Sequence, residues 1–338
     1  MIDMNLTTPL MPVASGVACV AGTTHRADPA QSQDAADLAM TPEGHHAVIV
    51  SDGIGSFACA GEAALYLVGE ARRLLGKSAD IWECSYSLFM ELWHRLADEA
   101  RDREETLPAG ERVPEENRGR SYGATLLVAK ETADEIQIAY AGNGGVFHIR
   151  GDFAGWGERL PLPWSATNYL NPHTVLDGGR EALYRYLGAF APQERAEPTI
   201  LSFHKDARVG DIILVCTDGI YSADQSRCGD PGDGSLWAEV PIPLTRVLNA
   251  LRGVFNSGMP LDGRVLQSAL DAVLADLRGK HLIDDDATAG VLVTGAAVSY
   301  QHSLAHEHSL VRHKPSCRPS DAEISDAENE EIPHGVSD

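Results

Sequence analysis

The stretch YGATLLVAKETADEIQIAYAGNGGVFHIR, residues 122–150, contains three short apolar runs separated by polar turns. The runs at 122–129, 136–141 and 145–150 are rich in β-branched, aromatic and aliphatic residues, and their lengths are typical of β-strands. This stretch therefore predicts a meander of adjacent antiparallel strands.

Further strand and helix signals lie on both sides of this stretch. Helical spacing of apolar residues predicts amphipathic helices, and short apolar runs predict strands. Charged residues and prolines predict an exposed connector at 101–120, and residues 151–205 are expected to be irregular. Strands followed by helices and a meander, without regular alternation, predict an α+β layered sandwich and not a doubly wound sheet. The predicted strands are 17–22, 46–50, 211–216 and 287–294, and the predicted helices are 61–75, 81–101, 244–255 and 264–277.

Length and charge limit the classes of function. The chain has 338 residues, 43% of them hydrophobic, which is enough for one large domain or two ordinary ones. A formal charge of −22 disfavours nucleic acid and anionic membrane as partners. The amino terminus lacks the basic region of a secretory signal, and no apolar run approaches the roughly 20 residues that span a bilayer. We therefore expect a soluble, monomeric protein.

The cysteines indicate the redox compartment. None of the six forms a CxxC pair, and several lie inside apolar runs, which is typical of reduced and mostly buried thiols. We therefore expect a cytoplasmic protein without a disulfide framework. The cysteines are Cys19, Cys59, Cys84, Cys216, Cys228 and Cys317.

Aspartates stand at the ends of the apolar runs. Asp52 lies in IVSDGIG and Asp218 in LVCTDGI, each directly after a predicted strand, whereas Asp285 lies in LIDDDAT at a strand entrance. Asp34 lies in the polar segment GTTHRADPAQSQDA. If the four carboxylates converge, they would repel one another until divalent cations neutralised them, and oxygen-only ligands favour Mg²⁺ or Mn²⁺. Asp-Gly is also a common turn dipeptide, so a single one is more often a turn than a ligand.

The order of the motifs resembles one known family. The sequence contains, in order, GTTHRADPAQSQDA, VIVSDGIGS, YGATLLVA, AYAGNGGVFHIRG, DIILVCTDG and DDATAGVLV. This series is similar to that of metal-dependent protein serine/threonine phosphatases of type 2C, in the bacterial branch whose second motif reads DGxGS. The resemblance covers about residues 17 to 294. It implies a four-layer α-β-β-α sandwich, in which two antiparallel sheets are flanked by helices, with a binuclear metal site at one end.

The resemblance assigns metal roles to individual positions. Asp52 would bridge two Mg²⁺ or Mn²⁺ ions and Gly53 would supply a backbone carbonyl. Asp34 would serve one ion, whereas Asp218 and Asp285 would serve the other. These four aspartates are the expected catalytic residues, because two ions can activate a shared water for in-line attack on phosphorus without a phosphoenzyme.

Among the departures from the family pattern, one concerns a third ion and another concerns phosphate binding. Asn143 stands in GNGG where the family commonly has an aspartate that binds a third ion, so third-ion binding is expected to be weakened, although Asn143 can equally be a turn residue. Arg26 is the candidate for gripping phosphate, but its spacing to Asp34 is longer than usual in the family.

The expected function is hydrolysis of phosphoserine and phosphothreonine in proteins, including targets of a bacterial Ser/Thr kinase. One alternative is a pseudophosphatase that uses the same fold as a phosphoprotein-binding or regulatory module, and another is a phosphatase of a small metabolite. Residues 1–300 are expected to form the catalytic domain. Residues 301–338, which are rich in His and then acidic, are expected to form a disordered tail.

Overall fold

The apolar runs of the sequence form the central strands of two antiparallel sheets in the computed structural model. The structure describes residues 13–23, 32–77, 85–108, 110, 112–153, 166–177, 180–222, 227–229, 237–239 and 241–312. The first sheet has the order β1 (Ala14–Val20), β16 (Ala287–Val293), β13 (Ile212–Cys216), β7 (Gly145–Ile149) and β8 (Ala166–Asn168). The second has the order β12 (Thr199–His204), β6 (Glu135–Ala141), β5 (Leu126–Glu131), β3 (His46–Asp52) and β2 (Asp34–Met40).

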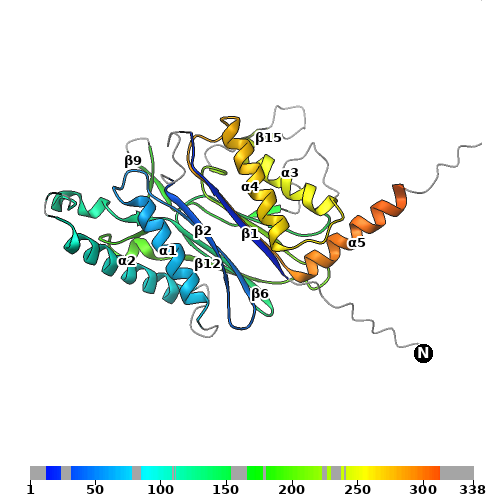
Figure 1. Ribbon diagram of the computed structural model, residues 1–338, viewed down its shortest axis with the longest axis horizontal. Coiled ribbons are helices and arrows are strands. Elements are labelled where there is room, and N and C mark those ends of the chain that lie inside the picture. The colour runs from blue at the N-terminus through cyan, green and yellow to red at the C-terminus, as the bar shows by residue number, and fades with distance from the viewer. Residues whose placement is uncertain are drawn as a thin grey trace, which may run out of the picture.

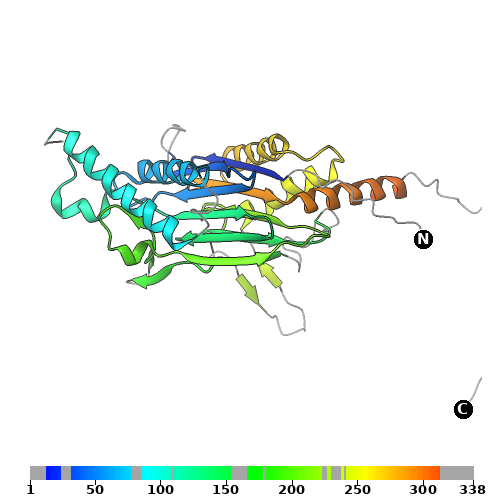
Figure 2. The same ribbon diagram turned by 90° about the horizontal axis from the view of Figure 1, so that it is seen from below.

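The two sheets stack face to face, with helices on both outer faces (Figures 1 and 2). Side chains such as Val48, Ile213 and Leu292 fill the space between the sheets. The second sheet is covered by α1 (Ala60–Leu75) and α2 (Tyr86–Thr106). The first is covered by α3 (Ile242–Asn256), α4 (Gly263–Gly279) and α5 (Gly295–Arg312). The expected four-layer α-β-β-α sandwich is confirmed.

Burial on both faces explains why the central strands have continuous apolar sequences. In β3, Val48 points between the sheets, whereas Ile49 packs against α1 and α2 on the outer face. In β13, Ile213 and Leu214 divide in the same way between the inner layer and the helices α3 and α4. Such strands lack the alternation of a half-exposed strand.

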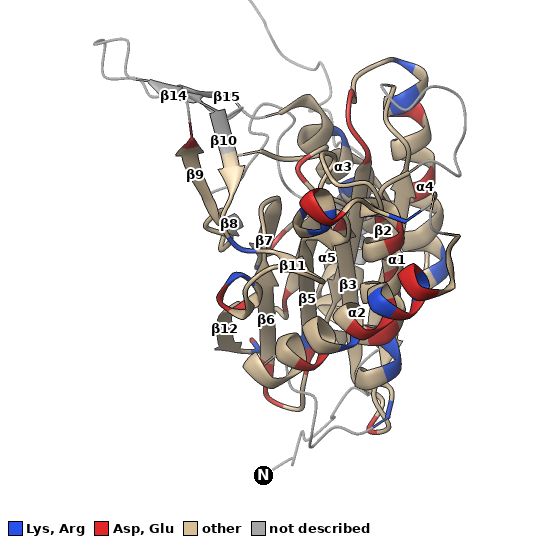
Figure 3. Cartoon of the chain, turned by 90° about the vertical axis from the view of Figure 1, so that its left-hand side faces the viewer, with Lys and Arg blue, Asp and Glu red and all other residues tan. Residues whose placement is uncertain are grey.

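The helices present one apolar face to the sheets and a charged face to solvent. In α4, the buried residues Leu266, Leu270, Leu274 and Leu277 recur at helical spacing, and the Asp262 side chain caps the helix by accepting from the Val265 amide at 2.9 Å. On the outer faces of α1 and α2, acidic and basic residues alternate, as Figure 3 shows. The helices therefore gain their stability mainly from packing.

Three expectations from the sequence need correction. The predicted meander stops after β5 and β6, because β7 crosses to the other sheet and pairs with β13 and β8. The crossing uses the Gly142–Gly145 turn, in which Gly142 and Gly144 have φ values of +139° and +104°. Strand β2 begins at the end of the polar segment before β3, where no strand was expected, and the region expected to be irregular contains strand β12.

Short elements decorate one end of the sandwich and α5 extends it. They are η2 (Glu115–Arg120), η3 (Gln193–Ala196), the pair β4 (Gly123–Ala124) with β11 (Leu187–Gly188), the hairpin β9 (Thr174–Asp177) with β10 (Arg180–Leu183), and β14 (Arg227–Gly229) with β15 (Trp237–Glu239). The β9–β10 hairpin projects away from the two sheets (Figure 3). Helix α5 continues to Arg312, beyond the tail boundary expected at residue 300, and residues 313–338 lie outside the described part of the chain.

Candidate functional site

Asp34 and Asp52 face each other at one end of the second sheet. Asp34 begins β2 and Asp52 ends β3, and the antiparallel register pairs the two residues directly. Asp34 is only 8% exposed, and its Oδ2 accepts a hydrogen bond from Thr217 Oγ1 at 2.8 Å. Its Oδ1 is buried without a hydrogen-bond partner among the described residues. The second sheet therefore places two carboxylates side by side in a buried position.

Burial and neighbouring carboxyl groups change the protonation of this pair. Burial raises the pKa of Asp34 to about 7, although hydrogen bonds with Asp52 and with the Thr217 hydroxyl act in the opposite direction. Burial, followed by the charges of Asp34 and Asp218, raises the pKa of Asp52 well above its usual range. Asp285 contributes to the same effect. All four predicted aspartates therefore act electrostatically on one place.

Asp218 comes from the first sheet, directly after β13. The adjacent Gly219 allows the chain to pass close to the strand-entrance segment, because a Cβ on Gly219 would lie 1.9 Å from the Asp286 carbonyl oxygen. Asn143, from the turn after β6, donates through Nδ2 to Asp218 Oδ2 at 2.7 Å, and its Oδ1 is buried without a hydrogen-bond partner in the described region. Asn143 thus orients Asp218 and is more than a turn residue.

The triple aspartate before β16 divides into different tasks. Asp285 is exposed to the cavity described below. Asp286 is buried and accepts hydrogen bonds from the Gly22 amide at 2.8 Å and the Gln33 amide at 2.5 Å. Asp286 therefore anchors the residues that lead into Asp34, as expected of a residue that supports the site from behind.

Gly53 holds the turn after β3 in close contact with its neighbours. Its amide donates to the Gln33 carbonyl at 3.0 Å, and a Cβ on Gly53 would lie 2.7 Å from the carbonyl carbon of Ala60. The Asp52 amide donates to Thr125 Oγ1 at 2.9 Å, and the Thr125 amide donates back to the Asp52 carbonyl at 2.7 Å. Thr125 and Thr217 were missed in the sequence, although both stand beside quoted motifs.

A large cavity opens over these residues. It has a volume of about 1250 Å³ and is lined by Asp52, Gly53, Asn143, Asp218 and Asp285, among others. A second cavity of about 510 Å³ shares Asn143, Asp218 and Asp285 with it. Five of the positions predicted from sequence therefore line one cavity, and Asp34 lies behind them against Asp52. Arg26 lies outside the described residues.

Three of the four carboxylates have a hydrogen-bond partner in a neighbouring residue. Within the described ranges, no three His, Cys, Asp or Glu side chains stand close enough to form a group that could hold a metal ion. Asp34 is bonded to Thr217 and Asp218 to Asn143, while Asp285 accepts from the Asp286 amide at 2.9 Å.

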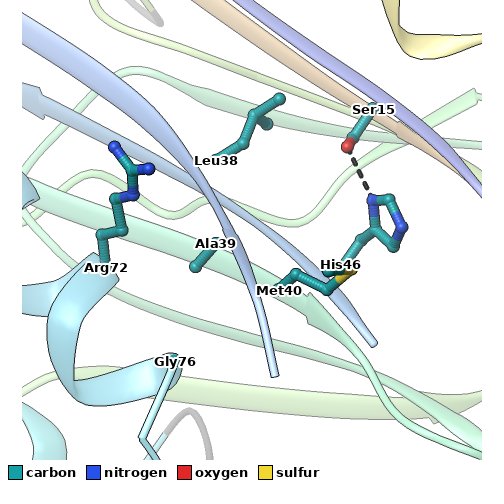
Figure 4. Close-up of a pocket in the computed structure, with 7 residues that line it drawn as sticks. All are labelled: Ser15, Leu38, Ala39, Met40, His46, Arg72 and Gly76. Atoms are coloured by element: carbon teal, nitrogen blue, oxygen red, sulfur yellow. Dashed lines mark hydrogen bonds between the residues drawn. The ribbon is translucent and has the colours of Figure 1, made fainter. Parts of the chain in front are cut away.

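A smaller cavity of about 340 Å³ lies at the opposite end of β2 and β3 (Figure 4). Ser15 Oγ lies 2.9 Å from His46 Nδ1 there, and Arg72, which also lines it, forms an ion pair with Asp37 at 2.8 Å. The polar side chains of this cavity thus already have partners within the protein.

None of the helices in the described part of the chain has the length and apolar character needed to cross a bilayer.

Comparisons with known proteins agree with this arrangement. Residues 21–225 match the family model described as protein phosphatase 2C. Among solved structures, a bacterial serine phosphatase with an arginine-to-lysine mutation is 13% identical, with a TM-score of 0.54, covering 82% of this chain and 96% of that chain. Serine/threonine phosphatase Stp1 from Staphylococcus aureus is 14% identical, with a TM-score of 0.51, covering 83% of this chain and 94% of that chain.

The Mycobacterium tuberculosis serine/threonine phosphatase PstP/Ppp is 15% identical, with a TM-score of 0.51, and the match covers 83% of this chain and 98% of that chain. At these identities the solved structures establish a shared fold. The search of curated proteins finds no match to this chain.

Proposed function

Because the chain belongs to the protein phosphatase 2C family, whose members are protein serine/threonine phosphatases, we propose that it hydrolyses phosphoserine and phosphothreonine in proteins with two divalent cations. The observation that carries this proposal is that Asp52, Asp218 and Asp285 line one cavity, with Asp34 paired directly with Asp52 behind them.

The donor set fits hard divalent cations such as Mg²⁺ or Mn²⁺. It consists of oxygen atoms, and Asp34 Oδ1 is buried without a hydrogen-bond partner among the described residues. Burial raises the pKa values of Asp34 and Asp52, and neighbouring carboxylates raise them further, so a bound cation would favour the ionised form of both side chains. When bound, the cations would supply charge neutralisation for the phosphoryl group and acidify a shared water.

The residues of the chain would divide the work as follows. Asp52 would contact both cations and Gly53 would offer its carbonyl, while Asp34 would serve one cation. Asp218 and Asp285 would serve the other. Thr217 and Asn143 hold two of these carboxylates in position. No side-chain nucleophile is needed in this arrangement, so we expect no phosphoenzyme.

Asn143 bears on the expected third ion. Its amide group is directed at Asp218, where an aspartate would add a charge. We therefore expect a third cation to bind weakly.

The presence of all four carboxylates favours an enzyme over a pseudophosphatase. A monomeric, cytoplasmic protein that acts on targets of a bacterial kinase remains part of the proposal.

Hydrolysis of p-nitrophenyl phosphate with millimolar Mn²⁺ tests the function. We expect activity that EDTA abolishes and that Asp52→Asn lowers by at least about 100-fold, because the bridging carboxylate would be lost. Asp134→Asn, at an exposed carboxylate in the turn between β5 and β6, serves as the matched control. Wild-type activity no higher than that of Asp52→Asn would refute the proposal. Faster turnover of a metabolite than of any phosphopeptide would redirect it to small molecules.

A further inference from the structure

The two cavities over the carboxylates form one trough. The larger and the smaller cavity share Asn143, Leu183, Asp218, Asp284 and Asp285. Beyond this shared floor each cavity is lined by residues of its own, and the volumes are about 1250 Å³ and 510 Å³. The combined space exceeds that of a typical small-molecule pocket, at about 300–1,000 Å³. An extended peptide could therefore cross the floor with residues on either side of it.

The two arms differ in their chemistry. Arg120 and Arg195 line the larger arm together with apolar side chains such as Phe57 and Phe190, whereas no arginine or lysine is among the described residues that line the smaller one. The smaller arm has an apolar wall formed by Pro241, Ile242, Pro243, Leu282 and Ile283. Ile242 is 55% exposed, so it is available for contact. The arginines therefore belong to the larger arm alone, and the wall around Ile242 belongs to the smaller arm alone.

Both arginines are positioned by the loop that follows Asp52. The Arg120 carbonyl accepts from the Ala58 amide at 3.4 Å. The Arg195 guanidinium lies 5.4 Å from the centre of the Tyr186 ring, and this ring makes an edge contact with Phe57 at 5.6 Å. A stacked arginine loses less side-chain freedom on binding an anion.

The donors of these arginines remain available to a ligand. Glu116 and Asp177 line the same arm, yet within the described ranges no carboxylate forms an ion pair with Arg120 or Arg195. Arginine matches carboxylate and phosphate groups through paired hydrogen bonds. The arm thus offers two exposed guanidinium groups beside the site of phosphate removal.

We propose that the trough selects phosphoproteins whose phosphoserine or phosphothreonine has an anionic side chain on one side and an apolar side chain on the other. The anionic group, a carboxylate or a second phosphate, contacts Arg120 and Arg195. The apolar side chain lies against Ile242 and its neighbours. This inference rests on the proposed function, because it places the attacked phosphoryl group over the shared floor.

Matched phosphopeptides test the selection. One set carries Glu, phosphoserine, Ala or Lys on one side of the attacked phosphoserine and Leu or Ser on the other, in both chain directions. We expect kcat/KM to be about threefold to tenfold higher for peptides with an anionic and an apolar flank than for peptides with Ala and Ser, as for exposed ion pairs. The Glu and phosphoserine arms tell which anion is preferred.

Variants connect the preference to the trough. The double variant Arg120→Gln/Arg195→Gln should lose the preference for the anionic flank, and Ile242→Ser should lose the preference for Leu. Arg208→Gln, at an exposed arginine in the turn between β12 and β13, should retain both. Hydrolysis of p-nitrophenyl phosphate, which has no flanking residues, should stay within about twofold of wild type in every variant.

Several results would overturn the inference. Equal kcat/KM for anionic and neutral flanks, or a preference for Lys, would do so. A parallel loss of p-nitrophenyl phosphate hydrolysis in the arginine variant would also do so, because it would assign the arginines to the attacked phosphoryl group. If wild type hydrolyses nothing, the proposed function fails separately. Fluorescence anisotropy of labelled versions of the same peptides then tests the trough. Preferential binding of peptides with an anionic flank that the arginine variant loses supports the trough, and equal binding of anionic and neutral peptides refutes it.

Discussion

Replacing Asp34 with asparagine should stabilise the metal-free protein at alkaline pH, although it removes a proposed metal ligand. Asp34 is buried, lies opposite Asp52 and has a pKa of about 7, compared with 3.8 for a free side chain. In the folded state it therefore holds a proton that the unfolded chain releases at much lower pH. A raised carboxyl pKa means that stability is lost as pH rises from about 4 through 7.

The size of the effect follows from that shift. A difference of about 3 pKa units corresponds to roughly 4 kcal/mol of unfolding free energy, fully lost only above pH 7. Asparagine does not titrate, and it also removes the repulsion that Asp34 exerts on Asp52. We expect Asp34→Asn to be more stable than wild type at pH 8 in EDTA by up to about 4 kcal/mol, or several degrees in Tm. The advantage should fall to about 1 kcal/mol at pH 4.5 and disappear below the unfolded pKa of 3.8.

Thermal unfolding in EDTA between pH 4.5 and 8 measures this difference. Asp134→Asn, with an exposed carboxylate, controls for titration elsewhere in the chain and should follow wild type at every pH. Added Mn²⁺ should raise the Tm of wild type at pH 8 more than that of Asp34→Asn. If the curves of wild type and Asp34→Asn stay parallel across the pH range, Asp34 does not carry the burial and repulsion deduced from its position.

Three other changes test the site and its supports. Asn143→Asp replaces the donor 2.7 Å from Asp218 by a carboxylate, so it should lower metal-free stability by about 1–3 kcal/mol. It should also tighten Mn²⁺ binding in calorimetry, and an unchanged Mn²⁺ affinity would contradict the role of Asn143. Burial lowers the pKa of His173 to about 4, so its contribution to stability is complete above pH 6.5 and is lost as pH falls toward 4. In urea unfolding, His173→Gln should be less stable than wild type at pH 7 and should lose less unfolding free energy between pH 7 and 5. Equal losses of unfolding free energy in the two proteins would argue against this role. Gly219→Ala forces a Cβ to within 1.9 Å of a backbone oxygen and should cost at least about 2 kcal/mol of stability and most of the activity. Gly253→Ala in α3, with open space around it, should be neutral or stabilising by about 1 kcal/mol. Equal effects of the two substitutions in thermal unfolding would refute the packing argument.

Much of the site could be predicted from local sequence. Asp52 and Asp218 each follow an apolar run and precede a glycine, and the structure places both at strand ends on one cavity floor. Asp34 was found through the order of motifs, because strand β2, with the sequence DAADLAM, lacks the apolar character of the other central strands. Arg120 and Arg195 could not have been selected in this way, since nothing in their neighbouring residues distinguishes them from other exposed arginines.

The sequence by itself determined the apolar central strands, the amphipathic helices and the aspartates Asp52 and Asp218 that follow two of these strands, because strand runs, helical spacing and turn glycines depend on near neighbours in the chain. Only the tertiary structure decided that β7 leaves its expected partners for β13, that Asp34 lies opposite Asp52, and that Asn143 turns its amide toward Asp218. These are contacts between residues far apart in the chain. They depend on how two sheets with apolar inner faces stack, and strands buried on both faces carry no pattern that identifies their neighbours.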